Sequence, residues 1–151
     1  MKHFKSLKVV VISLVLTLIS ANVNAQKSYI SQNKVMAETL SQEFGIPSAI
    51  ILAVAYVESG GGTSKNSKTF HNHFGIVGKN TVTKSRYKSF ASAKDSYRAF
   101  CEMLSRKKYY TRLKGSDNTA AWVKAMASAG YSTQPQEWMK RVNYVLHKFS
   151  L

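Results

Sequence analysis

The hydrophobic and polar positions of this chain predict helices over most of its length. Residues 31–44 form the first predicted helix, and Gly45 ends it. The second covers residues 47–58, and its stretch 49–55 is apolar at every position, Ala-Ile-Ile-Leu-Ala-Val-Ala. A helix that is apolar on all sides is buried, so we expect this one at the centre of the fold. The glycines at 60–62 cannot continue it.

A small β segment is expected after the second helix. Residues 63–80 are predicted to be a loop. Residues 81–91 are rich in Thr, Val, Tyr and Phe, and they predict a small hairpin. The next motif, Ser92-x-x-Asp95, resembles a capping box and predicts the start of a helix.

Three later helices each carry one apolar stripe, which indicates core packing and not a ligand site. They begin at the capping box, near Thr119 and at Pro135. Together the elements predict one mostly helical α+β domain. The predicted stripes are Tyr97, Phe100, Cys101 and Leu104, then Trp122, Ala125, Met126 and Ala129, then Trp138, Val142, Val145 and Phe149.

Residues 1–25 have the three-part pattern of a signal peptide. Three lysines form a basic start, residues 9–19 are almost entirely apolar, and Val23-Asn24-Ala25 offers small residues for cleavage. The apolar run is shorter than the about 20 residues of a membrane-spanning helix, which disfavours an anchor. We therefore expect an exported protein, periplasmic or extracellular, in which residues 26–151 form one domain without stable membrane insertion.

The charge of the chain points to anionic partners. It carries 22 Lys and Arg against 7 Asp and Glu, and its net charge of +15 becomes +12 without the three lysines of residues 1–25. Such a charge attracts polyanions. Export argues against nucleic acid, so we expect anionic polymers of the cell envelope as partners; a role in solubility alone stays open. Cys101 is the only cysteine, which excludes an intramolecular disulfide, and we expect a monomer.

Glu58 stands out among the few acidic residues. It follows the most apolar helix and lies at the C-terminal end of that helix, so burial and the helix dipole both disfavour its carboxylate form. A carboxylic acid that stays protonated near neutral pH suits glycosidic cleavage, in which the leaving oxygen receives a proton. A purely structural helix end is the alternative. The other acids have structural interpretations on helices or at helix starts: Glu38, Glu43, Glu102 and Glu137, and Asp95 and Asp117.

Polar and aromatic residues elsewhere offer further binding groups. The segment 72–76 has an Asn that can bond an amide or a hydroxyl and a Gly that permits a tight turn. His71 and His73 alternate without a nearby Cys, Asp or Glu, so we expect no metal and no cofactor. Tyr109 and Tyr131 could stack on sugar faces, although packing is the commoner role of a lone Tyr.

Four short motifs occur in a fixed order along the chain. They are Ala55-x-x-Glu58-Ser59-Gly60-x-Gly62-x-Ser64, then Asn72-x-Phe74-Gly75-Ile76, then Tyr87-x-x-Phe90 with Ser92-x-x-Asp95, then Ala129-Gly130-Tyr131. This series resembles the glucosaminidase family of bacterial peptidoglycan hydrolases, over about residues 31–149. No single motif is decisive, but their order and spacing together are specific.

The resemblance implies a lysozyme-like fold, with the small β-hairpin lobe lying over a substrate groove. It implies endo-β-N-acetylglucosaminidase activity on the glycan strands of peptidoglycan. Glu58 matches the catalytic acid of the family, and Tyr131 matches its active-site tyrosine. The expected substrate-binding residues are Ser64, Asn72, His73, Phe74, Gly75, Tyr87 and Tyr109.

The chain also departs from the family pattern. Gly61 and Val77 replace a frequent Trp and a frequent Lys, and residues 77–91 contain no Asp or Glu, although some members carry a second carboxylate there. Two alternatives to a second carboxylate are open: the acetamido group of the substrate attacks the sugar carbon, or a water held by neutral groups does so. Two other functions stay open: a muramidase or lytic transglycosylase on the same polymer, and a non-catalytic wall-binding assembly factor.

Overall fold

The structure, a computed structural model, describes the backbone of residues 3–151 and the side chains of residues 24–151. Most side chains of the predicted signal peptide, residues 1–25, lie outside the described part, and the signal peptide stays a prediction. Within the described residues no helix carries an apolar stretch long enough to cross a bilayer.

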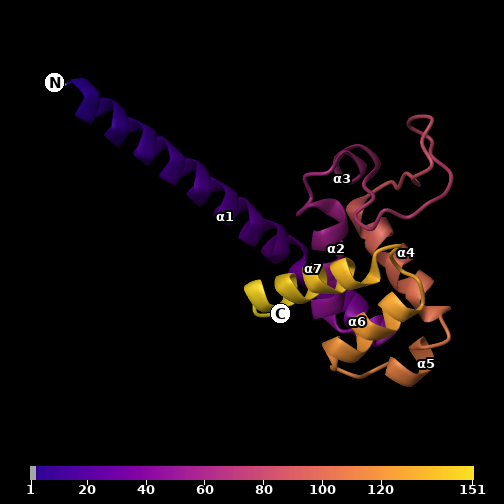
Figure 1. Ribbon diagram of the computed structural model, residues 1–151. Coiled ribbons are helices and arrows are strands. Elements are labelled where there is room, and N and C mark those ends of the chain that lie inside the picture. Colours follow the sequence, from indigo (N-terminus) through magenta and orange to yellow (C-terminus); the bar gives the residue numbers. More distant parts are fainter. Residues whose placement is uncertain (1–2) are drawn as a thin grey trace.

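Helix α1 spans His3–Phe44, so it begins well upstream of the predicted start at residue 31. Residues 3–44 contain neither Pro nor Gly, and nothing there interrupts helical hydrogen bonding. The C-terminal part of α1 packs on the other helices through the buried side chains of Tyr29, Ala37 and Leu40. Figure 1 shows its N-terminal part extending away from them.

Helix α2, Ser48–Ser59, lies at the centre of the domain, as its apolar sequence predicts (Figure 1). Every residue from Ile50 to Ala55 is buried. The helix packs against α1, α4 (Ala93–Ser105), α6 (Thr119–Ser128) and α7 (Pro135–Lys148). Because all its sides are covered, α2 fixes the position of Glu58 in its last turn.

Local capping interactions set the starts of the other helices. Ser92 confirms the predicted capping box: its Oγ accepts a hydrogen bond from the Asp95 backbone at 3.2 Å and donates one to Asp95 Oδ2 at 2.7 Å. At α6 the capping residue is Asn118, which accepts from the Ala121 backbone at 2.9 Å, and not the neighbouring Asp117. Two short helices occur where none was predicted, α3 (Lys65–Phe70) and α5 (Tyr110–Leu113).

The predicted hairpin at residues 81–91 is not confirmed, because the structure shows no extended strand among these residues. Among the described residues the only bridge in this region pairs Val77 with Tyr87, antiparallel. The segment does fold back on itself, and Asn80 closes its tip by accepting from two backbone N–H groups at 2.8 Å. Val77 and Val82 are 61 % and 55 % exposed, so these two side chains bury little apolar surface against the rest of the fold. A two-stranded ribbon that buries little apolar surface is marginal, which accounts for the irregular backbone here.

Candidate active site

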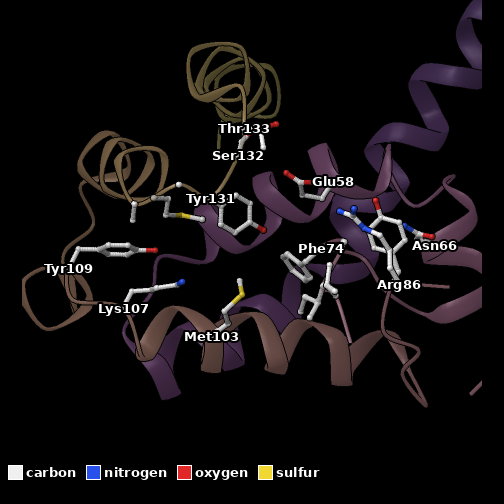
Figure 2. Close-up of a pocket in the computed structure, with 17 residues that line it drawn as sticks. Glu58, Asn66, Phe74, Arg86, Met103, Lys107, Tyr109, Tyr131, Ser132 and Thr133 are labelled. Carbon is white, nitrogen blue, oxygen red and sulfur yellow. The ribbon is translucent and has the colours of Figure 1, made fainter. Parts of the chain in front are cut away.

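A groove with a cavity volume of about 600 Å³ runs past the C-terminal end of α2. Its walls come from the loop after α3, the end of α4 and the connection between α6 and α7 (Figure 2). The lining residues are Glu58, Asn66, Phe74, Gly75, Ile76, Val77, Arg86, Tyr87, Met103, Lys107, Tyr109, Met126, Ala129, Gly130, Tyr131, Ser132 and Thr133.

Glu58 is the only carboxylate among the described residues that line this groove. Burial raises the pKa of Glu58, in the direction expected from the apolar helix that precedes it. Two groups act against this shift, because the Trp138 Nε1–H donates to Glu58 Oε1 at 2.8 Å and Arg141 lies nearby. A half-buried carboxyl of this kind holds its proton to higher pH than an exposed glutamate and can serve as a proton donor.

Tyr131 also lines the groove, directly after Gly130, which ends the turn that follows α6. Its ring packs against Trp138 with centroids 5.0 Å apart. Its hydroxyl is buried and has no hydrogen-bond partner among the described residues. Figure 2 shows the hydroxyl pointing toward the side of the groove where Glu58 and Phe74 lie. Burial first, and the Glu58 charge second, raise the pKa of Tyr131 well above its ordinary value, so the phenol is protonated and free to donate.

Four predicted substrate-binding residues line the groove. Phe74 forms part of the floor, and its ring stacks on the buried Phe100 at 4.2 Å. Gly75 has φ +64°, and a Cβ there would lie 4.0 Å from Glu58 Oε2, so the glycine keeps the floor open beside the acid. Tyr87 and Tyr109 lie in the walls. The structure therefore gathers these four residues with Glu58 and Tyr131.

Three other predicted binding residues are outside the groove walls, because their polar atoms are used within the protein. Ser64 caps α3 by accepting from the Ser67 backbone at 3.2 Å. Asn72 is 1 % exposed; it donates to the carbonyls of Ile76 and Lys88, both at 2.8 Å, and accepts from the Ile76 backbone at 3.0 Å. Asn72 thus holds the loop that carries Phe74 and Gly75.

His73 also faces away from the groove, into a buried cluster behind Glu58. Its Nδ1 lies 2.7 Å from the hydroxyl of Tyr29, which is 2.9 Å from the hydroxyl of Tyr97 and accepts from Ser59 Oγ at 3.3 Å. Gly62 is required beside this cluster, because its φ is +79° and a Cβ would lie 2.7 Å from the Tyr29 ring. The cluster ties α1, the end of α2 and α4 together and supports the turn after Glu58.

Several groove residues were not predicted from the sequence. Arg86 and Lys107 bring positive charge to the walls, and Ser132 and Thr133 extend the segment that starts at Tyr131. Ser132 and Thr133 directly follow Tyr131 in the sequence, and this is the one signal that could have identified them. Trp138 was assigned to the core from its helical spacing; it is indeed buried, but its indole N–H reaches Glu58.

Three other acids are held in ion pairs, and one of them, Glu137, lines a smaller hollow beside Glu58. Glu43 is held at the surface by both guanidinium nitrogens of Arg98, at 2.6 and 2.7 Å. Glu38 and Glu137 pair with lysines on their own helices. Within the described residues no three His, Cys, Asp or Glu side chains come together in a way that could hold a metal ion.

The family model of the glucosaminidases, described as mannosyl-glycoprotein endo-β-N-acetylglucosaminidase, matches residues 34–151. The chain belongs to the glucosaminidase family. It is therefore a glycoside hydrolase domain by family, as the ordered motifs predicted. Two relatives are the peptidoglycan hydrolases FlgJ of Escherichia coli O157:H7 and of strain K12. Each is 25 % identical over 142 residues, covering 79 % of this chain and 45 % of the relative. This glucosaminidase chain thus spans less than half the length of these relatives.

Solved structures establish the fold. The catalytic domain of the autolysin Auto from Listeria monocytogenes aligns with TM-score 0.70 and 16 % identity over 83 % of this chain and 85 % of that one. The glycoside hydrolase domain of FlgJ from Salmonella typhimurium aligns with TM-score 0.65 and 20 % identity, over 83 % of this chain and 88 % of that one. A peptidoglycan hydrolase from Sphingomonas sp. A1 aligns with TM-score 0.65 and 18 % identity, over 79 % of this chain and 86 % of that one. The mostly helical, lysozyme-like part of the predicted fold is confirmed.

Proposed function

We propose that this protein is a peptidoglycan hydrolase, an endo-β-N-acetylglucosaminidase that cleaves the glycan strand with Glu58 as general acid. The observation that carries the proposal is the setting of Glu58. It is the sole carboxylate among the described groove residues, burial raises its pKa, and Tyr131 lines the same groove. The family assignment and the peptidoglycan hydrolases among its relatives support the choice of substrate.

The first chemical step follows from the position of the acid. A glycan strand lying in the groove would place a glycosidic oxygen beside the Glu58 carboxyl. Protonated Glu58 donates its proton to that oxygen while the bond to the sugar breaks, and positive charge develops on the sugar ring. The Trp138 indole N–H then stabilises the carboxylate that remains, since it already donates to Oε1.

Among its described residues the groove offers no second carboxylate as nucleophile, and Glu137, which lines a smaller hollow beside Glu58, is paired with Lys140 at 2.9 Å. Residues 77–91 contain no Asp or Glu, and the described groove walls hold no acid besides Glu58. We propose that the acetamido oxygen of the substrate attacks the anomeric carbon as the glycosidic bond breaks and forms a cyclic oxazolinium, a known alternative to the two-carboxylate scheme. Water then adds to that carbon and gives a proton to the Glu58 carboxylate, which restores the acid and leaves a reducing N-acetylglucosamine end. The unpartnered hydroxyl of Tyr131 is a suitable donor or acceptor to orient that group.

The proposed substrate fits the expected location and charge. A signal peptide at residues 1–25 would deliver the domain to the envelope, where peptidoglycan lies. The basic surface would favour association with wall peptides and other anionic polymers that carry carboxylates or phosphates.

Product analysis on purified peptidoglycan tests the proposal. We expect fragments with a reducing N-acetylglucosamine end. A reducing muramic acid end would identify a muramidase, and an anhydro-muramic end would identify a lytic transglycosylase.

Glu58→Gln tests the role of the acid in the same assay. Gln keeps the shape of Glu but cannot donate a carboxyl proton, so turnover should fall at least about a hundredfold while binding to the wall persists. Glu38→Gln, on the exposed face of α1, is the matched control and should act like the wild type. Near-normal hydrolysis by Glu58→Gln would refute the assignment of the acid. Wall binding without any hydrolysis by the wild type would favour a non-catalytic assembly factor.

A further inference from the structure

A second, smaller hollow adjoins the groove at Glu58. Its cavity volume is about 180 Å³, and it lies between the end of α2 and the start of α7. Glu58, Ser132 and Thr133 line both hollows, so the acid stands at the point where they meet. A chain that passes the acid therefore has space on both sides of it.

The small hollow leads on to a third one, on the outer faces of α2 and α7. The two share Val57 and Arg141. The third hollow has a volume of about 350 Å³, and its walls are formed by Tyr56, Val57, Gly60, Lys140, Arg141, Tyr144 and Val145. Three hollows thus follow one another through shared residues, from the groove past Glu58 to Tyr144.

We infer that the glycan strand continues beyond the groove, through the small hollow, and onto an exit surface formed by Tyr56, Arg141 and Tyr144. This inference rests on the proposed function, because it extends the path of the same substrate. It adds a sugar-binding site on α2 and α7, outside the groove that holds the proposed reaction.

The chemistry of the exit surface suits sugars. Tyr144 is 62 % exposed, an unusual position for a large aromatic side chain, and Lys148 Nζ lies over its ring at 5.4 Å from the centroid. A sugar can pack its C–H face against the ring where the lysine does not cover it. Arg141 makes no salt bridge within 4.0 Å in the described part of the chain, whereas its neighbour Lys140 is paired with Glu137 at 2.9 Å. The charge of Arg141 acts on Glu58 and Glu137, and its N–H groups are available to donate hydrogen bonds to sugar hydroxyls or acetamido carbonyls where the small hollow meets this surface.

A glycan strand fits this surface better than a protein partner does. The surface is formed by seven residues, while a stable protein interface takes about 20–30 residues from each side. It is also continuous with the catalytic acid, which a single extended polymer can exploit. An endo-acting hydrolase gains affinity when sugars on both sides of the cleaved bond are held.

The test compares a long substrate with a short one. Tyr144→Ser should reduce kcat/KM on long, peptide-free glycan strands about threefold to tenfold, since a stacking contact contributes on the order of 1 kcal/mol. On a tetrasaccharide that fills only the groove, the variant should match the wild type, which also shows that it is folded. Val35→Ser is the matched control, because Val35 is 72 % exposed on α1 and lines none of the three hollows.

Equal kcat/KM for Tyr144→Ser and wild type on long strands would overturn the exit surface and leave the proposed function intact. A wild type that cuts no peptidoglycan would refute the proposed function itself. Self-association through this surface would make the specific activity of the wild type fall as protein concentration rises. If Tyr144→Ser showed no such fall, the surface would be assigned to self-association and the inference would be overturned.

Discussion

The indole nitrogen of Trp138 donates a hydrogen bond of 2.8 Å to Oε1 of Glu58, joining α7 to the end of α2. Trp138 is 5 % exposed, so the donor is held rigidly. Burial raises the pKa of Glu58, and this bond opposes the rise because it favours the carboxylate. The acid is therefore set between two opposing influences, both of which single substitutions can remove.

Trp138→Phe should raise the pKa of Glu58 further, because the bond that favours the carboxylate is lost. A general acid works while protonated, so the fall of kcat/KM on the alkaline side should move to higher pH. Trp122→Phe is the matched control, since Trp122 is also buried and its Nε1 donates at 3.0 Å to the Ser116 carbonyl, away from Glu58. A pH profile that shifts equally in both variants, or toward lower pH, would contradict the role of the bond.

Glu58→Gln should stabilise the fold at neutral pH. The raised pKa means that the native state keeps this proton at pH values where the unfolded chain has lost it, so wild-type stability decreases as pH rises above about 4.3. Gln does not titrate. The Tm of the variant should exceed that of the wild type at about pH 7, and the difference should shrink below about pH 4. Thermal melts across this range test the sign, and a difference that does not vary with pH would contradict it.

Tyr131→Phe should lower turnover by about tenfold to a hundredfold, less than Glu58→Gln, because the proton donor remains. It should not lower the free energy of unfolding, since the deleted hydroxyl has no partner within the described chain. Tyr97→Phe makes the contrast: its hydroxyl lies 2.9 Å from that of Tyr29, and its loss should destabilise the fold by about 1 kcal/mol. Full activity in Tyr131→Phe would remove the hydroxyl from the mechanism.

Asn72→Ala should lower the free energy of unfolding by about 2–4 kcal/mol, because several buried hydrogen bonds to the loop backbone are lost at once. Asn80→Ala, at the more exposed tip of the same loop, should cost less. Denaturant titration measures both. If Asn72→Ala kept its stability and lost only substrate affinity, the sequence-based assignment of Asn72 to substrate binding would be restored.

Binding to isolated cell walls should weaken steeply with salt. The net charge of the chain is +15, and screening shortens the range of its field from about 10 Å at 0.1 M to about 3 Å at 1 M salt. Cosedimentation with walls at low and high salt measures the effect. Binding that does not change with salt would exclude the basic surface as a determinant of wall affinity.

The partly buried position of Glu58 at a groove could be predicted from the sequence because two local signals coincide there. The preceding stretch is apolar at every position, which places it in the core, and glycines directly after it end the helix at the surface of a groove. Such signals depend on residues adjacent in the chain. They are readable without knowing how distant segments pack.

The parts that were missed depend on distant contacts. Helical spacing placed Trp138 on a buried face, but no pattern shows which atom its N–H will meet 80 positions away. Asn72 and His73 are residue types that serve a ligand or a loop equally well, and only packing decides between the two. The predicted hairpin is not confirmed for a similar reason, because the strand propensity of residues 81–91 does not show how little of Val82 the rest of the fold will cover.

Cys101 gives the fold one more property. The thiol is fully buried, and burial raises its pKa to about 12, so the folded protein should not exchange with disulfides or form covalent dimers. Outside the reducing cytoplasm such a chain would need no oxidative folding catalyst. The sulfur is exposed only when the core of the protein opens, so the rate of thiol labelling would measure how often this opening occurs. The single cysteine is thus an internal reporter of how often the folded core opens.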